Sequence, residues 1–309
     1  MQHRSFLRRL EARLLEPGMV ALVRGLFALA RRLGPDRSSE VSGAMLRRLG
    51  PLTPQHRIAL RNLRAAFPEK GEEEIRAILA GAWDNLGRTV AEYAHLGDLF
   101  DFDPEADTPG RIEVEGIEHF VALREDGRPG IVFSAHLANW ELPAICAARF
   151  GLDATAVYRP PNDPAAARMV HEVRSQTMGG LAAARQGAAF VMNGVLERGG
   201  HLGMLVDQHF TRGVPVAFFG RPAMANPILG KLARRFDCPV HGVRVIRLPG
   251  GRFRLELTPP LDLPRDAGGE IEVQGAMQAM TSVVEGWVRE HPDQWLWMHR
   301  RWRTPVKAT

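Results

Sequence analysis

The sequence predicts an α/β protein in which a mixed central sheet is flanked by helices and preceded by a helical N-terminal region. The first observation is helical periodicity over residues 1–97, interrupted only by two short proline-containing breaks. The second is a change after Gly110, where short runs rich in β-branched residues alternate with helical segments. This alternation is typical of a sheet with helices on its faces. The 309 residues allow one large domain with an appendage, or two modest domains.

Residues 1–33 are predicted to form a basic helical arm. Residues 1–64 hold 13 Arg and no Lys against four Asp and Glu, whereas the rest of the chain holds more acidic than basic residues. A basic arm suits a polyanion, either nucleic acid or an anionic membrane surface, although a solvated helix surface has the same charge pattern. The apolar residues between the arginines favour the membrane.

The apolar stretch Pro17 to Ala30 indicates how the arm would meet a membrane. It is 14 residues long with Arg24 in its middle, and a spanning helix needs about 20 mostly apolar residues. Ala28-Leu29-Ala30 imitates a signal-peptide cleavage site, but Arg24 interrupts the apolar run and acidic residues stand in the leader. We therefore predict an uncleaved helix in the membrane interface, a peripheral or weak anchor with arginines toward lipid phosphates.

Residues 34–109 are predicted as a helical region, and residues 110–309 as the α/β core. Helix breaks are expected at Pro51 to Pro54 and at Pro68 to Gly71. From Glu72 onward, apolar residues recur at spacings of three and four, and the first turn is acidic, as the helix dipole favours. Asp98 to Pro109 forms an acidic connector.

Strands and helices are predicted to alternate through the core. The expected strands are Arg111–Glu115, Gly130–Ser134, Ala154–Tyr158, His201–Val206, Val214–Phe219, Pro239–Arg247 and Phe253–Thr258. The expected helices are Ile117–Glu125, Asn139–Arg149, Ala165–Met178, Ala188–Glu197, Pro227–Phe236 and Glu270–Glu290.

Several catalytic motifs are missing from the sequence. It contains no G-x-S-x-G, no G-x-G-x-x-G, no complete P-loop and no H-E-x-x-H, which argues against a serine hydrolase, a dinucleotide enzyme, an NTPase and a zincin. Cys146 and Cys238 lie far apart in apolar sequence without metal-binding spacing. We therefore expect buried thiols, no metal site and no cofactor.

The strongest candidate for chemistry is the segment that follows the predicted strand Gly130–Ser134. Asn139 is a natural N-cap, which would place Glu141 in the first helical turn and His136 in the turn before it. Ligands of α/β sheets bind beyond the carboxyl ends of the strands. Glu141 could accept a hydrogen bond from one imidazole nitrogen and leave the other free as a base. From spacing alone, a capping carboxylate beside an incidental loop histidine is the better reading.

Ordered blocks of residues resemble the lipid A late-acyltransferase family of the glycerolipid (lysophospholipid) acyltransferase superfamily. His136 and Glu141 are similar to the His-x4-Asp/Glu motif of that superfamily. The other blocks run over most of the chain: Arg61-Asn62-Leu63 with Phe67-Pro68-Glu69, Leu86-Gly87-Arg88-Thr89 with Glu92, Tyr158-Arg159-Pro160 with Asn162, Asp207-Gln208, Gly213-Val214-Pro215-Val216 to Phe218-Phe219-Gly220 with Ala223, and Pro292, Gln294, Trp295 and Trp297 to Thr304. Met224-Ala225-Asn226-Pro227 departs from the family, in which a threonine often follows the fifth block.

The resemblance implies a glycerolipid acyltransferase-like fold and a defined reaction. A fatty acyl chain would pass from an acyl carrier protein thioester to a hydroxyl of a lipid A precursor, at the cytoplasmic face of the inner membrane. His136 would act as the general base, and Glu141 would hold the imidazole and stabilise the imidazolium. The implied partners are acyl carrier protein, the lipid A precursor and an anionic membrane surface, with no nucleic acid.

Five residues form the predicted substrate-binding set: Asn139, Arg159, Asp207, Gln208 and Arg300. Arg159 is expected to meet a phosphate or the carrier's phosphopantetheine, and the alternative is an ion pair with Asp207 or Asp163. Asp207 and Gln208 follow a predicted strand and should stand near His136. Arg300 belongs to an aromatic, basic tail that contacts a membrane or a sugar phosphate, or docks as a C-terminal segment.

Two alternatives remain open at this point. One is a related acyltransferase that acts on another glycolipid, such as a mannosylated phosphatidylinositol, from acyl-CoA. The other is a non-catalytic, basic membrane-binding or nucleic-acid-binding protein that kept the fold.

Overall fold

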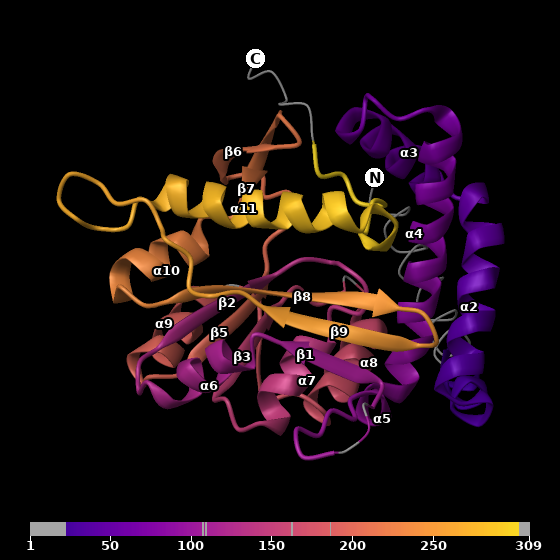
Figure 1. Cartoon of the computed structure of the whole chain (residues 1–309), viewed down its shortest axis with the longest axis horizontal. Helices are drawn as coiled ribbons and strands as arrows, with labels where there is room; N and C mark the ends of the chain where they lie inside the picture. Colours follow the sequence, from indigo (N-terminus) through magenta and orange to yellow (C-terminus); the bar gives the residue numbers. More distant parts are fainter. Residues whose placement is uncertain (1–22, 107, 109, 162, 186, 303–309) are drawn as a thin grey trace, which may run out of the picture.

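The computed structural model describes residues 23–106, 108, 110–161, 163–185 and 187–302. Figure 1 shows a central sheet with α11 (Val273–Glu290) and a two-stranded hairpin over one face, and with α6 (Ile117–Glu125) and α7 (Leu142–Arg149) beneath the other. The predicted class, an α/β protein with a helical N-terminal region, is confirmed.

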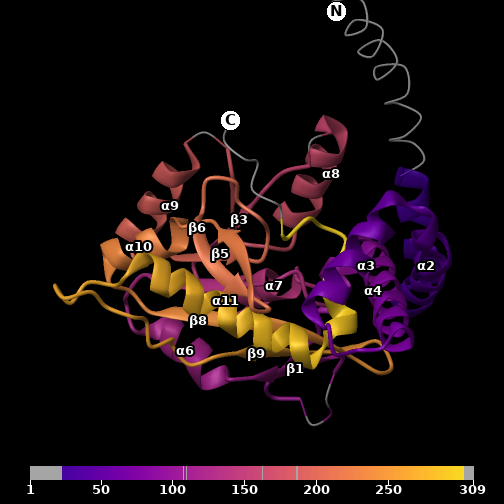
Figure 2. The same cartoon turned by 90° about the horizontal axis from the view of Figure 1, so that it is seen from above.

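The N-terminal helices gather at one end of the sheet in both views (Figures 1 and 2). They are α2 (Pro35–Leu49), α3 (Pro54–Ala66) and α4 (Glu72–Glu92), with short turns at Gly50–Leu52 and Tyr93–His95 and a short helix α5 at Leu96–Leu99. The Glu74 side chain accepts the Gly71 amide at 3.1 Å, and Glu72 to Glu74 fill the first turn of α4.

Helices α2 and α4 pack closely because Gly87 has no side chain. A Cβ at Gly87 would lie 2.4 Å from the Ser42 carbonyl oxygen, and the Ser42 hydroxyl donates to the Gly87 carbonyl at 2.7 Å. Ile75 and Leu79 on another part of α4 are buried in the main core. α4 therefore joins the helical region to the core.

The central sheet has seven strands in the order β1-β9-β8-β2-β5-β3-β4. Their bounds are β1 Ile112–Glu115, β2 Gly130–Ser134, β3 Ala154–Tyr158, β4 Gly180–Ala183, β5 His201–Leu205, β8 Val240–Leu248 and β9 Arg252–Leu257. β8, β2, β5, β3 and β4 pair in parallel, so their carboxyl ends meet at one edge, while β9 runs antiparallel to β8. The predicted mixed sheet is confirmed.

Three details differ from the predicted strands. β4 was not predicted, since its sequence GLAA offers no apolar alternation. β6 (Val214–Phe218) pairs with β7 (Arg221–Ala225) as a separate hairpin outside the main sheet. β7 was also not predicted, because its sequence contains Pro222, which usually argues against a strand.

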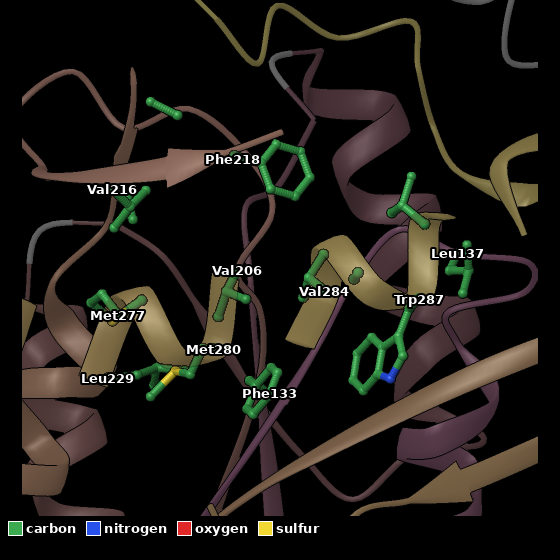
Figure 3. Packing of buried hydrophobic residues seen from close by; sticks show 14 of the residues in the cluster. Phe133, Leu137, Val206, Val216, Phe218, Leu229, Met277, Met280, Val284 and Trp287 are labelled. Atoms are coloured by element: carbon green, nitrogen blue, oxygen red, sulfur yellow. The ribbon is translucent and has the colours of Figure 1, made fainter. Parts of the chain in front are cut away.

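The face of the sheet under α11 is a fully packed core. Ile131 and Phe133 of β2 are completely buried there, and the rings of Phe133 and Trp287 stack with centroids 5.8 Å apart. Figure 3 shows Met280, Val284 and Trp287 of α11 directed toward this layer. The alternation along β2 sends Val132 and Ser134 to the opposite face.

The remaining helices are α8 (Pro164–Ser175), α9 (Ala188–Glu197) and α10 (Ile228–Phe236), and a turn at Pro292–Gln294 precedes the C-terminal segment. Of these helices, α9 and α10 pack in the main core with α11, and α8 packs beside β4 on the second face. α7 packs over the second face with Leu142 and Ile145, beside Leu255 of β9.

Most of the predicted membrane arm, residues 1–22, lies outside the described residues. Residues 23–33 are helical, and Leu26 and Leu29 are about half exposed, at 55% and 52%. Within the described ranges, no helix is both long enough and apolar enough to cross a bilayer.

Candidate active site

His136 stands in a loop that begins directly after β2 and is held by the C-terminal segment. The Leu296 amide donates to the His136 carbonyl at 3.0 Å, and the Ala138 amide donates to the Gln294 carbonyl at 3.0 Å. Ala138 has a φ of 47°, in the left-handed region that disfavours alanine. Such strain persists where surrounding contacts fix the backbone, and it is typical of functional loops.

The His136 side chain is paired with Asp207. Asp207 comes shortly after β5, the strand that lies beside β2. The Nδ1 atom of His136 lies 2.7 Å from Oδ1 of Asp207, and the His136 amide donates to Oδ2 at 2.8 Å. The Asp207 side chain is completely buried, whereas 14% of the His136 side chain is exposed. The sequence-based expectation that Asp207 lies near His136 is therefore confirmed, and the two form a histidine–carboxylate pair.

Two C-terminal residues complete the surroundings of Asp207. Trp295 donates through Nε1 to Oδ2 of Asp207 at 2.7 Å, and His299 Nε2 lies 3.2 Å from the Asp207 carbonyl oxygen. Burial opposes the charge of Asp207, but the attraction and hydrogen bonds of His136 are stronger and lower the pKa of this carboxyl below its usual range. Asp207 is therefore an ionised acceptor at neutral pH.

The ionised state of Asp207 determines which ring nitrogen of His136 carries the lone pair. Because an ionised carboxylate only accepts, a neutral His136 carries its proton on Nδ1 and keeps a lone pair on Nε2. That Nε2 atom lies 3.2 Å from the side-chain nitrogen of Gln208, an exposed residue. The predicted proximity of Gln208 to His136 is thus confirmed, and the basic nitrogen is on the accessible side of the ring.

Glu141 does not make the contact expected of it. Its carboxylate binds Tyr93 and Arg174: Arg174 Nε donates to Oε2 at 2.8 Å and Nη2 to Oε1 at 2.5 Å, and the Tyr93 hydroxyl also donates to Oε1. Both ring nitrogens of His136 have the other partners described above. The prediction that Glu141 accepts a hydrogen bond from His136 is therefore wrong. Asp207 is the carboxylate that pairs with the imidazole.

Asn139 also differs from its predicted local role. α7 begins at Leu142, so Asn139 lies in the loop and Glu141 takes the capping position. The Asn139 side chain accepts the Glu141 amide at 3.2 Å and donates to Glu92 at 2.9 Å, and it is fully buried. Asn139 therefore braces the loop against α4.

Glu92 connects this loop to the sheet through a buried ion pair. Arg247 of β8 donates to Glu92 Oε1 at 2.5 Å and to Oε2 at 3.0 Å, and it also donates to Asn85 at 2.9 Å. Together with Asn139, these bonds use both oxygens of Glu92. The His136 loop thus rests on a network that spans α4, β8 and the loop itself.

The remaining predicted residues, Arg159 and Arg300, are exposed. Among the described residues, no hydrogen bond or ion pair joins Arg159 to Asp207, whose oxygens are taken by His136 and Trp295. Asp163 instead caps α8 by accepting the Ala166 amide at 2.8 Å. Among the residues that the structure describes, neither Asp207 nor Asp163 forms an ion pair with Arg159.

Arg301, not Arg300, is the arginine built into the site. It is buried, donates to the Met224 carbonyl at 3.0 Å, and lies over the Phe218 ring with its guanidinium carbon 5.1 Å from the ring centroid. Burial lowers its pKa to about 10, against the attraction of Asp207. The sequence predicts an aromatic, basic tail, but it does not indicate that Arg301 is buried and Arg300 exposed.

An apolar cavity of about 140 Å³ lies between the sheet and α7. Trp140, whose ring centroid is 5.1 Å from that of His136, lines the cavity, as do Ser134 and Leu205, which lie two residues before His136 and Asp207. Glu141 and Arg174 also border it. The cavity therefore reaches the neighbourhood of the histidine.

Cys146 is the one thiol among the cavity's lining residues. Burial raises its pKa to about 12, so the thiolate is not populated at neutral pH. Among the described residues, no group of three or more His, Cys, Asp or Glu side chains is arranged to hold a metal ion.

Sequence reasoning missed Tyr93, Arg174, Arg247 and His299 as parts of the site. Arg174 and Arg247 lie more than thirty residues from their carboxylate partners, so no local spacing indicates them. Glu92 and Trp295, which also belong to the site, stand in the blocks that resemble the family. Those blocks were the signal in the sequence that pointed to them.

In the comparison with known proteins, the matching family model and the similar proteins named below are all lipid A biosynthesis acyltransferases. The family model described as bacterial lipid A biosynthesis acyltransferase matches residues 8–304. The chain is 25% identical over 272 residues to the lipid A biosynthesis palmitoleoyltransferase of Escherichia coli (strain K12), covering 85% of this chain and 82% of that protein. It is 26% identical over 254 residues to the lipid A biosynthesis myristoyltransferase of the same organism, covering 80% and 75%. It is also 24% identical over 249 residues to a lipid A biosynthesis acyltransferase of Haemophilus influenzae, covering 79% and 74%.

Proposed function

The chain belongs to the bacterial lipid A biosynthesis acyltransferase family and is an acyltransferase, and from this premise we propose the reaction that it catalyses. A fatty acyl chain is transferred from an acyl carrier protein thioester to a hydroxyl of a lipid A precursor, with His136 as the general base. The pairing of His136 with buried Asp207, close to an apolar cavity that Trp140 and Ser134 line, carries this proposal.

The proposed reaction is a direct transfer between two substrates. The acceptor hydroxyl gives its proton to Nε2 of His136 as its oxygen attacks the thioester carbonyl carbon. The tetrahedral intermediate collapses, the carbon–sulfur bond breaks, and the thiolate of the carrier takes the proton back from the imidazolium. An ester and a free thiol result. The raised pKa of Cys146 and the missing nucleophile elbow both support transfer without an acyl-enzyme.

Asp207 is proposed as the residue that supports the imidazolium. Its negative charge lies 2.7 Å from Nδ1, where the positive charge of the protonated ring develops. General-base action of this kind contributes on the order of 10²–10⁴-fold in rate. The rest comes from positioning two lipid substrates and from donors at the oxyanion.

Three backbone amides of the His136 loop are already hydrogen-bonded within the protein. The amides of Leu137, Ala138 and Glu141 already donate to Ala135, Gln294 and the Asn139 side chain. An oxyanion hole formed by these three amides is therefore not proposed.

Glu141 is proposed to position α8 and the cavity mouth. Its bidentate bond to Arg174 joins the start of α7 to the last turn of α8, and both residues border the cavity. An ion pair with Glu141 at 3% and Arg174 at 13% side-chain exposure resists separation, because either partner alone would be a buried charge.

The basic arm and the exposed arginines are proposed to meet the phosphates of the acceptor and of the membrane. Arg24, Arg31 and Arg32 are exposed on the same helix as the half-exposed Leu26 and Leu29. This pattern suits a helix in the interface of the inner membrane, on its cytoplasmic face. Arg159 and Arg300 are exposed without the ion pairs that would compete with a phosphate or phosphopantetheine.

The test combines a purified reaction with an analysis of cells. Purified protein, acyl carrier protein thioester and a lipid A precursor lacking one secondary acyl chain should give the acylated lipid, and mass spectrometry of lipid A from a deletion strain should show the same chain missing. Transfer that uses only acyl-CoA would contradict the donor. An unchanged lipid A profile together with acylation of another glycolipid would contradict the acceptor.

A further inference from the structure

The face of the sheet under α7 is less tightly filled than the face under α11. Toward α11, Ile131 and Phe133 of β2 and Leu202 of β5 are fully buried, and Met204 of β5 beside Phe133 is partly buried. The alternate residues Val132, Gly203 and Ala156 retain partial exposure, although they lie in the middle of three central strands. The cavity accounts for this difference, because all three line it.

These three residues form one row across the floor of the cavity. Val132 pairs with Gly203, and Gly203 pairs with Ala156. The row in front, toward the His136 loop, contains Ser134 and Leu205, and the row behind contains His201 paired with Ala154. Because a strand rises about 3.3 Å per residue, each row lies roughly 7 Å from the next.

Gly203 leaves open space where another residue would fill it. A Cβ at Gly203 would have Ala156 Cα, at 4.0 Å, as its nearest neighbour, which is an ordinary van der Waals distance. Two glycines on other strands of the sheet differ: a Cβ would lie 2.6 Å from Leu123 at Gly130 and 2.4 Å from Thr155 at Gly180. Since glycine weakens a strand interior, a glycine that no packing contact requires indicates that the space itself is used.

We propose that Gly203 sets the length of the acyl chain that the enzyme accepts. This inference rests on the proposed function, because the occupant is the donor's acyl chain, which lies in the cavity with its thioester end near His136. The chain passes over Gly203 from the Leu205 row toward the His201 row. Any side chain at position 203 would stand in that path.

The shape and chemistry of the cavity suit a hydrocarbon chain. One water-sized group needs roughly 10–15 Å³ by this volume measure, so 140 Å³ has room for about ten methylene-sized groups. The lining is mostly apolar. Of its charged members, Glu141 and Arg174 neutralise each other, and Glu115 is exposed and paired with Arg254. An apolar chain gains from burial there, by about fourfold in binding for each methylene removed from water.

The experiment compares Gly203→Ala, Gly203→Val and Gly203→Leu with the wild-type enzyme, on saturated acyl carrier protein thioesters from octanoyl to palmitoyl. Larger side chains should shift the preferred donor to progressively shorter chains, with a loss of about fourfold for each methylene displaced and little change for octanoyl. Gly194→Ala is the matched control, since its Cβ also meets nothing within 4 Å but Gly194 lies on α9 and does not line the cavity. This control should keep the wild-type profile.

A second measurement does not depend on transfer. Free fatty acids of the same lengths should raise the melting temperature of the wild-type protein increasingly with length, and Gly203→Leu should lose that gain for the longest acids. A folded Gly203→Leu protein with the wild-type length profile, or with equal losses for all donors, would overturn the inference. Wild-type protein that binds fatty acids by length but transfers none would instead overturn the proposed function.

Discussion

At the level of single residues, the proposed base His136 is paired with a carboxylate that lies 71 positions further along the chain. We expect His136→Ala and Asp207→Asn each to lower the transfer rate by at least about 10²-fold, because one removes the base and the other removes the charge that supports it. The double variant should be scarcely worse than His136→Ala, since residues that act as a unit are not additive. Steady-state kinetics with acyl carrier protein thioester measure this. Losses that multiply in the double variant would contradict the pairing.

Glu141 is expected to behave differently from Asp207. Glu141→Gln weakens the bond to Arg174, so the protein should melt at a lower temperature and bind the donor more weakly. The pH dependence of kcat should stay as in the wild type, because no bond links Glu141 to the imidazole. Arg174→Ala provides the matched variant, and the two substitutions together should cost less stability than the sum of the single ones. A shift of the pH–rate profile in Glu141→Gln would assign it to the base after all.

His299 should make the folded state sensitive to acid. Burial lowers its pKa from the ordinary 6.5 to about 4, against the attraction of Asp207. Between these values the unfolded chain binds a proton that the folded protein refuses, so stability falls as the pH is lowered from about 6.5 to about 4, by up to about 3 kcal/mol. Urea unfolding of wild type and of His299→Gln across this range measures the effect. The difference between them should narrow with acidification, and a constant difference would contradict the prediction.

At the level of elements, the packing of α2 on α4 depends on one glycine. Gly87→Ala should lower the free energy of unfolding by about 1–3 kcal/mol, because the added Cβ would meet the Ser42 backbone at 2.4 Å. Gly286→Ala on α11 is the control, since its Cβ meets nothing within 4 Å, and it should be neutral or slightly stabilising. Chemical denaturation measures both. Equal stability of the two variants would mean that α2 moves away without cost.

The elements that the sequence predicted well are those with their own periodicity. The strands Gly130–Ser134 and Ala154–Tyr158 and the helix Ala188–Glu197 lie where β-branched runs and helical spacing placed them. α7 begins three residues after the predicted start at Asn139. Pro143 fits the first turn of a helix, and the capping preference of Asn139 favours the earlier start. The residues before α7 are held as a loop by Gln294 and Leu296, a contact that no local pattern reveals.

The site could be predicted only in part, because contacts between residues distant in the sequence leave no local pattern. The end of β2 and the end of β5 were expected to meet because parallel strands share an edge, and His136, Asp207 and Gln208 do meet there. Which carboxylate would reach the imidazole depended on the direction of two side chains after folding. Glu141 was nearer in sequence, but Arg174 of α8 lies on its other side and pairs with it.

At the level of the whole molecule, the charge is divided between a basic front and an acidic remainder. Deleting residues 1–33 should move the protein from the membrane to the soluble fraction and weaken activity on vesicle-borne acceptor. Membrane binding of the full chain should decrease with salt, since exposed charges are screened beyond about 8 Å at physiological ionic strength. Sedimentation with anionic vesicles measures this, and neutral vesicles serve as the control. A truncated protein that still sediments fully in high salt would contradict the role of the arm.

The C-terminal segment that holds the His136 loop also has a consequence for how the enzyme is made. The loop lies near the middle of the chain, yet Trp295, Leu296 and Gln294 supply the bonds that fix it and its carboxylate. During synthesis these residues leave the ribosome after every strand of the sheet, because β9 ends at Leu257, so the nascent chain carries its sheet before the His136 loop is fixed. A polypeptide that stops before Gln294 should therefore be inactive, and the cell gains no partial acyl transfer from such incomplete translation products.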